Sequence, residues 1–271
     1  MLIDMHMHTG GGALGFDMKS QMILDIMDKY NVDVALVSNG DASECDHSQV
    51  VLPEYLQVTQ EKALQDNIDF ARANAGRIYL AVWVKPKLQG MTDELYNLMK
   101  DNLDIIKAIK LHPYHSATAP NEKSVIPYLE FAKENNLAVI SHTDAGGKAS
   151  PLHLYEVAKM FPTVPFVMAH LGLGSDNSEA IELLSKADNL FGDTAWVPME
   201  STVKVINRFG SNRIMFGTDA PIDGIDTYKC NPKGERSMYM DYFEKIESII
   251  GTSAYEDLMY KNAMDILGMG K

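Results

Sequence analysis

The sequence has few cysteines, no long apolar run and a shortage of positive charge. Cys45 and Cys230 are the only cysteines among 271 residues. Two isolated cysteines do not make a disulfide framework, so free thiols in a reducing compartment are the simplest interpretation. No apolar run approaches the ~20 residues that a transmembrane helix needs, and the first six residues lack the basic start of a signal peptide. We therefore expect a cytoplasmic protein.

The shortage of positive charge limits the expected partners. Lys and Arg number 24 and Asp and Glu 37, which gives a net charge of −13. Such a surface repels phosphate backbones and anionic lipids, so neither nucleic acid nor a membrane is expected as a main partner. Apolar residues make up 46% of the chain, enough for a full hydrophobic core. We expect a small-molecule partner, and a homodimer because twofold symmetry is frequent among soluble oligomers.

Short apolar runs alternate with helical patterns from one end of the chain to the other. The runs are continuous rather than half polar, which is typical of parallel strands covered by helices. Strands are expected at residues 2–8, 33–39, 78–85, 108–114, 138–144, 165–172, 189–197 and 214–221. Helices are expected at residues 19–30, 61–75, 93–102, 124–135, 151–161, 178–186, 199–209, 239–250 and 253–267. Cap residues support two of the helix starts, at Thr92 and Ser150.

Eight alternating units predict a single (β/α)8 TIM barrel that spans residues 1–271. Division of 271 residues by eight gives about 34 per unit, close to a typical barrel of ~250 residues. The alternative is an open doubly wound sheet, which shares the same alternation. The barrel is preferred because an open sheet rarely has eight regular units with a metal-ligand residue at the end of both the first and the eighth strand.

Metal-ligand residues stand at the ends of four of the predicted strands. They are His6 and His8 on the first, His142 on the fifth, His170 on the sixth and Asp219 on the eighth. The C-terminal ends of all barrel strands meet at one rim, so these side chains should converge. Imidazoles and a carboxylate suit Zn²⁺ with one position left for water. The alternative, ordinary buried histidines bonded to carbonyls, does not explain why half of the eight histidines follow this one pattern.

Alternation of side chains along the first strand decides which way its histidines point. Strict alternation places His6 and His8 on one face together with Asp4, and the residues between them, Ile3, Met5 and Met7, on the other. If the methionines face the helices, the two histidines face the barrel axis and can reach one ion.

The order of these motifs resembles the amidohydrolase superfamily. Three segments look like its amidohydrolase-2 branch: Ile3-Asp4-Met5-His6-Met7-His8, Ala169-His170-Leu171-Gly172 and Phe216-Gly217-Thr218-Asp219-Ala220-Pro221. The closing segment Tyr260-Lys261-Asn262-Ala263 is also similar. The resemblance covers the chain from residue 3 to about residue 265. That branch includes hydrolases as well as decarboxylases of aromatic and related acids.

The resemblance also implies roles for the site residues. His6, His8, His142 and Asp219 would be the ligands of one Zn²⁺, and Asp219 would also accept a proton from the bound water. His170 would lie beside the metal and handle a proton or stabilise negative charge. This chemistry is sensible in itself, because a bound ion lowers the pKa of its water toward ~7 and polarises a substrate oxygen.

Lys110 and His112 are the candidates for substrate binding. Alternation along the fourth predicted strand places both on one side, so the pair is expected to face the pocket and to bind an anionic group of the substrate. Two other roles stay open for Lys110. It could be carboxylated and bridge two ions, as in binuclear relatives, or it could pair with a neighbouring aspartate inside the barrel. One metal ion is the preferred interpretation.

Two long connections follow predicted strand ends, at residues 40–59 and 222–238, and both should overhang the metal. Lys229 or Arg236 in the second could clamp an anion, although exposed surface is the simpler interpretation.

The leading function is a metal-dependent hydrolase that attacks an amide, lactone or ester bond in a small molecule. The first alternative is a non-oxidative decarboxylase of a small aromatic or unsaturated acid, which would use the same ligands. The second is a non-catalytic barrel that binds a metal or ligand. A binding protein would have no need for His170 beside an open metal position, which makes an enzyme the better interpretation.

Overall fold

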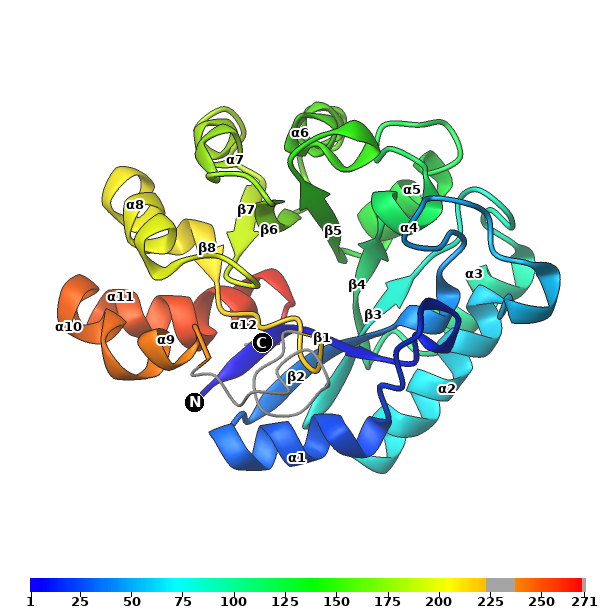
Figure 1. The fold of residues 1–271 in the computed structure, drawn as a ribbon, viewed down its shortest axis with the longest axis horizontal. Coiled ribbons are helices and arrows are strands. Elements are labelled where there is room, and N and C mark those ends of the chain that lie inside the picture. The colour runs from blue at the N-terminus through cyan, green and yellow to red at the C-terminus, as the bar shows by residue number, and fades with distance from the viewer. Residues whose placement is uncertain (223–236, 270–271) are drawn as a thin grey trace.

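The computed structural model describes residues 1–222 and 237–269 as a barrel of parallel strands with helices outside it (Figure 1). The strands are hydrogen-bonded in sequence order, so the predicted TIM barrel is confirmed and the open doubly wound sheet is not formed. Their bounds are β1 (Ile3–Thr9), β2 (Val34–Asn39), β3 (Ile78–Trp83), β4 (Ile106–Leu111), β5 (Ala138–Asp144), β6 (Phe166–Leu173), β7 (Leu190–Asp193) and β8 (Ile214–Met215).

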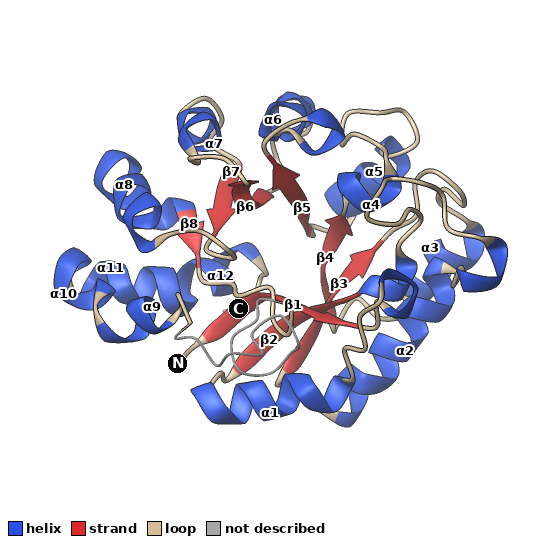
Figure 2. Cartoon of the chain, in the orientation of Figure 1, coloured by secondary structure: helices blue, strands red, loops and turns tan. Residues whose placement is uncertain are grey.

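The helices lie around the strands, as Figure 2 shows in blue and red. They are α1 (Ser20–Tyr30), α2 (Gln60–Ala73), α3 (Asp93–Lys100), α4 (Pro113–Ser116), α5 (Ile126–Glu134), α6 (Pro151–Met160), α7 (Ser178–Leu184), α8 (Met199–Phe209), α9 (Met240–Glu244), α10 (Ile246–Ile250), α11 (Thr252–Glu256) and α12 (Asn262–Ile266). The expected caps are present: Thr92 accepts the backbone N–H of Leu95, and Ser150 that of Leu152. None of the helices in the described residues is both long and apolar enough to span a membrane.

The barrel closes between β1 and the chain that follows β8. The backbone N–H of Met5 donates to the carbonyl of Phe216 at 3.0 Å, and that of Asp219 donates to the carbonyl of His6 at 2.7 Å. Regular pairing of β8 ends at Met215, well before the expected end at residue 221. The irregular segment beyond it brings Asp219 directly beside His6.

The apolar residues form two layers. One lies between the strands and the surrounding helices. The other fills the barrel with small and medium side chains, including Ala108, Ala138 and Ile140, and is closed at the bottom by Ala263 of α12. Burial of these layers is the main favourable term for the fold. It leaves the opposite, C-terminal end of the barrel to polar residues.

The expected strict alternation along β1 is wrong. A register shift between Asp4 and Met7 inserts a bulge into the pairing with β2. Ile3 and Met5 therefore belong to the cluster inside the barrel, whereas Met7 packs in the helix-facing layer. Asp4 points away from the barrel interior and accepts two hydrogen bonds from Thr218, from its hydroxyl at 2.6 Å and its backbone N–H at 3.1 Å. The bulge turns His6 toward the interior without Asp4 beside it.

The fourth strand also ends earlier than expected, at Leu111. His112 is the residue before Pro113, and such residues avoid the helical region. It takes the N-cap position of α4, with φ −130° and ψ 79°. His112 is therefore carried by a strand-to-helix turn rather than by the strand itself.

The loop after β2 lies over the C-terminal end of the barrel, where Glu44 and Cys45 donate their backbone N–H groups to the carbonyl of His115. Most of the loop after β8, with Lys229, Cys230 and Arg236, lies outside the described residues.

Candidate metal centre

A cavity of about 420 Å³ opens at the C-terminal end of the barrel. Most of the residues that line it have aromatic or imidazole side chains, and six of the eight histidines of the chain are among them. The polar lining residues at its base and walls are His8, His47, His112, Tyr114, His115, His142, Asp144, His170, Trp196 and Asp219. A concave site with convergent titratable groups is the usual place for a ligand or metal.

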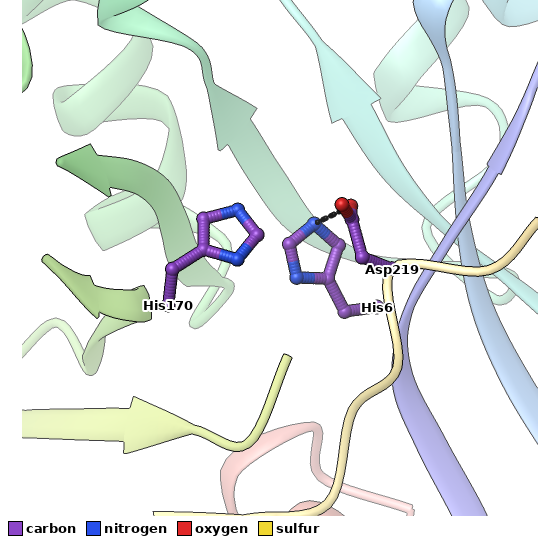
Figure 3. Close-up of side chains that lie close together, drawn as sticks. All are labelled: His6, His170 and Asp219. Atoms are coloured by element: carbon purple, nitrogen blue, oxygen red, sulfur yellow. Dashed lines mark ion pairs between the residues drawn. The ribbon is translucent and has the colours of Figure 1, made fainter. Parts of the chain in front are cut away.

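Three buried side chains could hold a metal ion, and two of them, His170 and Asp219, line this cavity. One ligand atom each from His6, His170 and Asp219 lies within 4.8 Å of the others. Figure 3 shows the ring of His6 between the His170 ring and the Asp219 carboxylate. The Nε2 atom of His6 is 3.2 Å from Oδ1 of Asp219. These residues come from β1, β6 and the segment after β8, so the structure brings together the two ends of the chain and its middle.

The remaining predicted ligands surround this group. Nε2 of His8 lies 2.8 Å from the same Oδ1 atom of Asp219. The ring of His142 is 4.8 Å from that of His170, centroid to centroid, and its Nε2 is 3.8 Å from Oδ2 of Asp144. All five predicted residues thus gather at one end of the barrel. The group with the closest ligand atoms contains His170, which was expected to lie beside the metal rather than to bind it. Which of the five residues bind the ion therefore stays a prediction.

Hydrogen bonds at the back of two imidazoles fix their tautomers. Nδ1 of His6 donates to Oδ2 of Asp193 at 2.8 Å, and Nδ1 of His170 donates to the carbonyl of Ala195 at 3.1 Å. Each ring therefore keeps a lone pair on Nε2, the atom that can bind a metal. His8 has the other tautomer in this structure, because its Nε2 donates to Oδ1 of Asp219 at 2.8 Å and its Nδ1 accepts from the Ser38 hydroxyl at 2.8 Å. Binding of a metal to Nε2 would move the proton to Nδ1, with Ser38 then accepting it.

The protonation states also suit a divalent ion, which binds neutral imidazoles and ionised carboxylates. Burial lowers the pKa of His6 well below its usual value and that of His170 to about 4, so both rings are neutral near pH 7. Burial alone would raise the pKa of Asp219, but His6 and His8 outweigh it and hold that pKa well below its usual range. The donor set therefore fits Zn²⁺ or a similar ion.

Lys110 lies beneath the imidazoles rather than among the cavity-lining residues. Its Nζ donates to Nε2 of His6 at 2.7 Å, and the side chain is almost fully buried. Burial lowers its pKa to about 8, while Asp219 and Asp193 oppose the shift. Of the two predicted substrate-binding residues, the structure thus places His112 in the cavity wall and Lys110 against a candidate ligand. The substrate-binding role of both stays a prediction.

Backbone strain marks the same region. His170, Leu171, Trp196 and Asp219 have φ angles of 70°, 47°, 58° and 67°, in the left-handed region that residues other than glycine rarely adopt. Such residues cost ~1–3 kcal/mol each and cluster at functional sites. Asn177 holds the first pair, because its amide donates to the carbonyls of His170 and Leu171.

Trp196 is a site residue that the sequence did not reveal. Its indole N–H donates to Oδ2 of Asp219 at 2.8 Å, on the side away from His6 and His8. The two oxygens of Asp219 therefore have different partners: Oδ2 is held by Trp196 and Oδ1 faces the imidazoles. No pattern in the sequence pairs residue 196 with residue 219.

Asp193 is a second residue that was missed. It is completely buried at the end of β7, where its carboxylate binds His6 and also accepts the backbone N–H of His170 at 2.9 Å. One signal could have found it, because it is an acidic residue that follows an apolar run, as Asp219 does. The expected strand 189–197 runs past it and hid that position.

Asp193→Asn is expected to weaken Zn²⁺ binding roughly 10- to 100-fold, the usual effect of removing a carboxylate behind a metal-binding histidine. The amide keeps the shape but accepts the His6 proton less well, so the ring loses basicity and orientation. Competition with a chromogenic chelator would measure the affinity. Asp4→Asn is the matched control: Asp4 is also fully buried, but its hydrogen bonds go to Thr218 and the His6 backbone rather than to an imidazole. Equal losses in both variants would contradict the role of Asp193.

Comparison with known proteins places these residues in a family context. A family model described as amidohydrolase matches residues 3–268. A search of curated proteins found no match. The chain resembles several solved structures at low identity, which show the fold.

Three of these structures belong to proteins whose names state different activities. The dihydroxybenzoic acid decarboxylase of Polaromonas sp. JS666, with bound manganese and 2-nitroresorcinol, is 12% identical over 100% of this chain and 97% of that one, with a TM-score of 0.69. The 4-oxalomesaconate hydratase of Rhodopseudomonas palustris is 15% identical over 99% and 96%, with a TM-score of 0.69. A probable 2-pyrone-4,6-dicarboxylic acid hydrolase of Acinetobacter baumannii, with citric acid bound, is 14% identical over 98% and 99%, with a TM-score of 0.64.

Proposed function

This chain belongs to the amidohydrolase family, and from that premise we propose that it is a metal-dependent hydrolase of a small-molecule amide, lactone or ester. The group of His6, His170 and Asp219 carries the proposal, because two neutral imidazoles and an ionised carboxylate present ligand atoms within 4.8 Å of one another. Nε2 of His6 and Oδ1 of Asp219, two acceptors, lie 3.2 Å apart, and the Lys110 ammonium 2.7 Å from Nε2 is the cation beside them in this structure.

The ion would be held by His6, His8, His142 and Asp219, with Zn²⁺ preferred. When bound, it would supply an acidified water and polarise the substrate oxygen. The protein residues then handle the proton. Asp219, which is ionised near pH 7, would accept the proton of that water, while Trp196 holds the carboxylate in position. His170 presents a neutral Nε2 that can take up or stabilise charge next to the substrate.

A decarboxylase is the second candidate. The ring stack in the cavity wall, where His112 lies between Trp83 and His142, suits a planar unsaturated acid. The names of similar folds include a decarboxylase and a hydratase, so the fold is compatible with several reactions. In a decarboxylase the same site would orient a carboxylate, and Asp219 or His170 would move the proton that replaces CO₂.

The test is a substrate screen with defined metal content. The protein is stripped with a chelator, reloaded with one equivalent of Zn²⁺ or Mn²⁺, and assayed against lactones, esters, amides and aromatic or unsaturated acids. Hydrolysis of esters and lactones is followed by proton release, hydrolysis of amides by the amine that is formed, and decarboxylation by CO₂. Metal-dependent hydrolysis would support the proposed hydrolase, and metal-dependent CO₂ release would contradict it and support the decarboxylase. A fully loaded protein without any turnover would favour the non-catalytic barrel and overturn the proposal.

Lys110→Met is expected to change Zn²⁺ affinity in opposite directions depending on whether the protein binds one ion or two. We propose a single ion with Lys110 as an ammonium group, so removal of a positive charge 2.7 Å from a ligand nitrogen should strengthen Zn²⁺ binding about tenfold. The stoichiometry should stay near one ion per chain. A carboxylated, bridging Lys110 requires the reverse: two ions in the natural protein, and fewer and weaker ones in the variant. Metal analysis and chelator competition on both proteins decide between them.

A further inference from the structure

Part of the cavity wall is formed by residues 10–18, the segment between β1 and α1, which we call the strap. Its two ends pair with each other: the backbone N–H of Gly10 donates to the carbonyl of Met18 at 2.9 Å, and that of Met18 donates to the carbonyl of Gly10 at 3.2 Å. Between these ends the chain makes a turn of 3-10 helix in which no residue is buried. The side chains of Leu14 and Phe16 line the cavity, so an incompletely packed segment forms part of its wall.

The turn of the strap is held together by its own backbone. The N–H groups of Leu14 and Phe16 donate to the carbonyl of Gly11 at 2.9 and 3.1 Å. Gly11 and Gly15 have φ angles of 78° and 83°, in the left-handed region that glycine adopts without strain. The turn can therefore keep its shape when its contacts with the rest of the barrel are broken, and it can move as one piece about its paired ends.

The loop after β2 is the firmer surface on which the strap rests. Glu44 and Cys45 are buried, and their backbone N–H groups donate to the carbonyl of His115 at 2.9 and 2.7 Å. The carboxylate of Glu44 also accepts the backbone N–H groups of Lys87 and Leu88, in the loop after β3, at 3.0 and 2.5 Å. Buried hydrogen bonds thus tie this loop to two other segments at the same end of the barrel.

His47, an exposed residue of the loop after β2, joins three segments of the cavity wall. Its Nε2 donates to the carbonyl of Leu14 in the strap at 3.0 Å. Its ring meets the ring of Phe16 edge-on, with centroids 5.8 Å apart. Its own carbonyl accepts the hydroxyl of Tyr114 in α4 at 2.5 Å. His47 therefore fastens the strap to the firmer loop at the edge of the cavity.

Asp41 supplies a second bond of the same kind, because its Oδ1 accepts the backbone N–H of Gly12 at 3.0 Å. Both bonds are exposed, so water can replace each lost partner and the net contribution of each bond is small. We expect each to be worth about a factor of two to ten in the equilibrium between a fastened and a released strap. The strap is thus held less firmly than the loop on which it rests.

We propose that the strap is a lid over the cavity, fastened by His47 and Asp41 and turning about its paired ends, Gly10 and Met18. The open state admits a ligand past Leu14. The closed state keeps water from the buried groups around the cavity, which strengthens the electrostatic interactions among them. Closure of a loop over a site is a common way to gate a reaction. The inference goes beyond the proposed function, since a lid would serve a hydrolase and a decarboxylase alike.

The test is collisional quenching of tryptophan emission by acrylamide. Trp83 and Trp196 are the two tryptophans of the chain and both line the cavity, so quenching reports how readily a small neutral molecule enters it. The natural protein is compared with two variants. Asp41→Ala removes one fastening bond without changing a cavity-lining side chain, and His47→Phe keeps a ring beside Phe16 but has no donor for the strap.

Each single variant should raise the Stern–Volmer constant at least twofold, and the double variant should raise it further. His153→Ala is the matched control and should leave the constant unchanged, because His153 is a partly exposed histidine of α6 that pairs with Glu156 and does not line the cavity. Circular dichroism checks that every variant is folded.

The lid requires both single variants to respond. A response of neither would mean that the strap is fixed, and a response of one alone would mean that the altered side chain acts locally; either result would overturn the inference. No metal and no turnover enter this measurement. Failure of the lid and failure of the proposed hydrolase function are therefore seen in separate experiments.

Discussion

Asp219→Asn is expected to remove the metal and to lower kcat/KM by roughly 10⁴-fold or more. The carboxylate is the one anionic member of the three-residue group, and His6 and His8 both approach its Oδ1 atom, at 3.2 and 2.8 Å. An amide has no charge to attract the ion and is a poor proton acceptor. The variant therefore loses two contributions at once: polarisation by the metal, and base catalysis, which alone is worth ~10²–10⁴-fold.

The measurement pairs metal content after gel filtration with kcat/KM for the substrate that the screen identifies. Asp4→Asn is again the control, because Asp4 is a fully buried carboxylate whose hydrogen bonds go to Thr218 and to the backbone N–H of His6 rather than to an imidazole. That variant should keep close to one equivalent of metal. Circular dichroism checks that both variants are folded. If Asp219→Asn kept its metal and more than a few per cent of its activity, the proposed centre would be wrong.

The sequence predicted the barrel because each local signal agreed with the next. Continuous apolar runs, capped helices and eight repeating units point to one architecture, and ligand residues at strand ends point to one rim. Lys110 shows the limit of such reasoning. Its inward direction follows from strand geometry, but its contact with His6 depends on how far the side chain extends across the barrel.

The details that were mispredicted or missed depend on local breaks in regular structure. The bulge in β1 reverses the direction of Asp4, and a two-residue period has no means of showing where a bulge lies. His112 leaves the strand because Pro113 begins a helix, a signal that was present in the sequence. The contact between Trp196 and Asp219 joins two loop residues with positive φ, where neither strand nor helix periodicity applies. Functional sites often lie at such positions, so errors there are expected.

His170→Asn is expected to keep most of the metal and to lose most of the turnover, by ~10²–10⁴-fold. The substitution suits the backbone, because φ at this position is 70° and asparagine is among the residues that tolerate the left-handed region. The short amide does not extend to where Nε2 of His170 stands, so the proton-handling atom next to the substrate is removed. The ligands on β1 and the segment after β8 are left in place.

His170→Asn tests whether His170 handles a proton or binds the metal. The test is needed because the ligand atom of His170 lies within 4.8 Å of those of His6 and Asp219, close enough for all three to bind one ion. Metal content and rate must therefore be measured on the same sample, with His6→Asn as the comparison. His6 donates to Asp193 and faces Asp219, so its loss should remove metal and turnover together. If His170→Asn loses metal in proportion to rate, as His6→Asn should, then His170 is a ligand. Proton handling would then rest on Asp219 alone, with Trp196 holding its second oxygen.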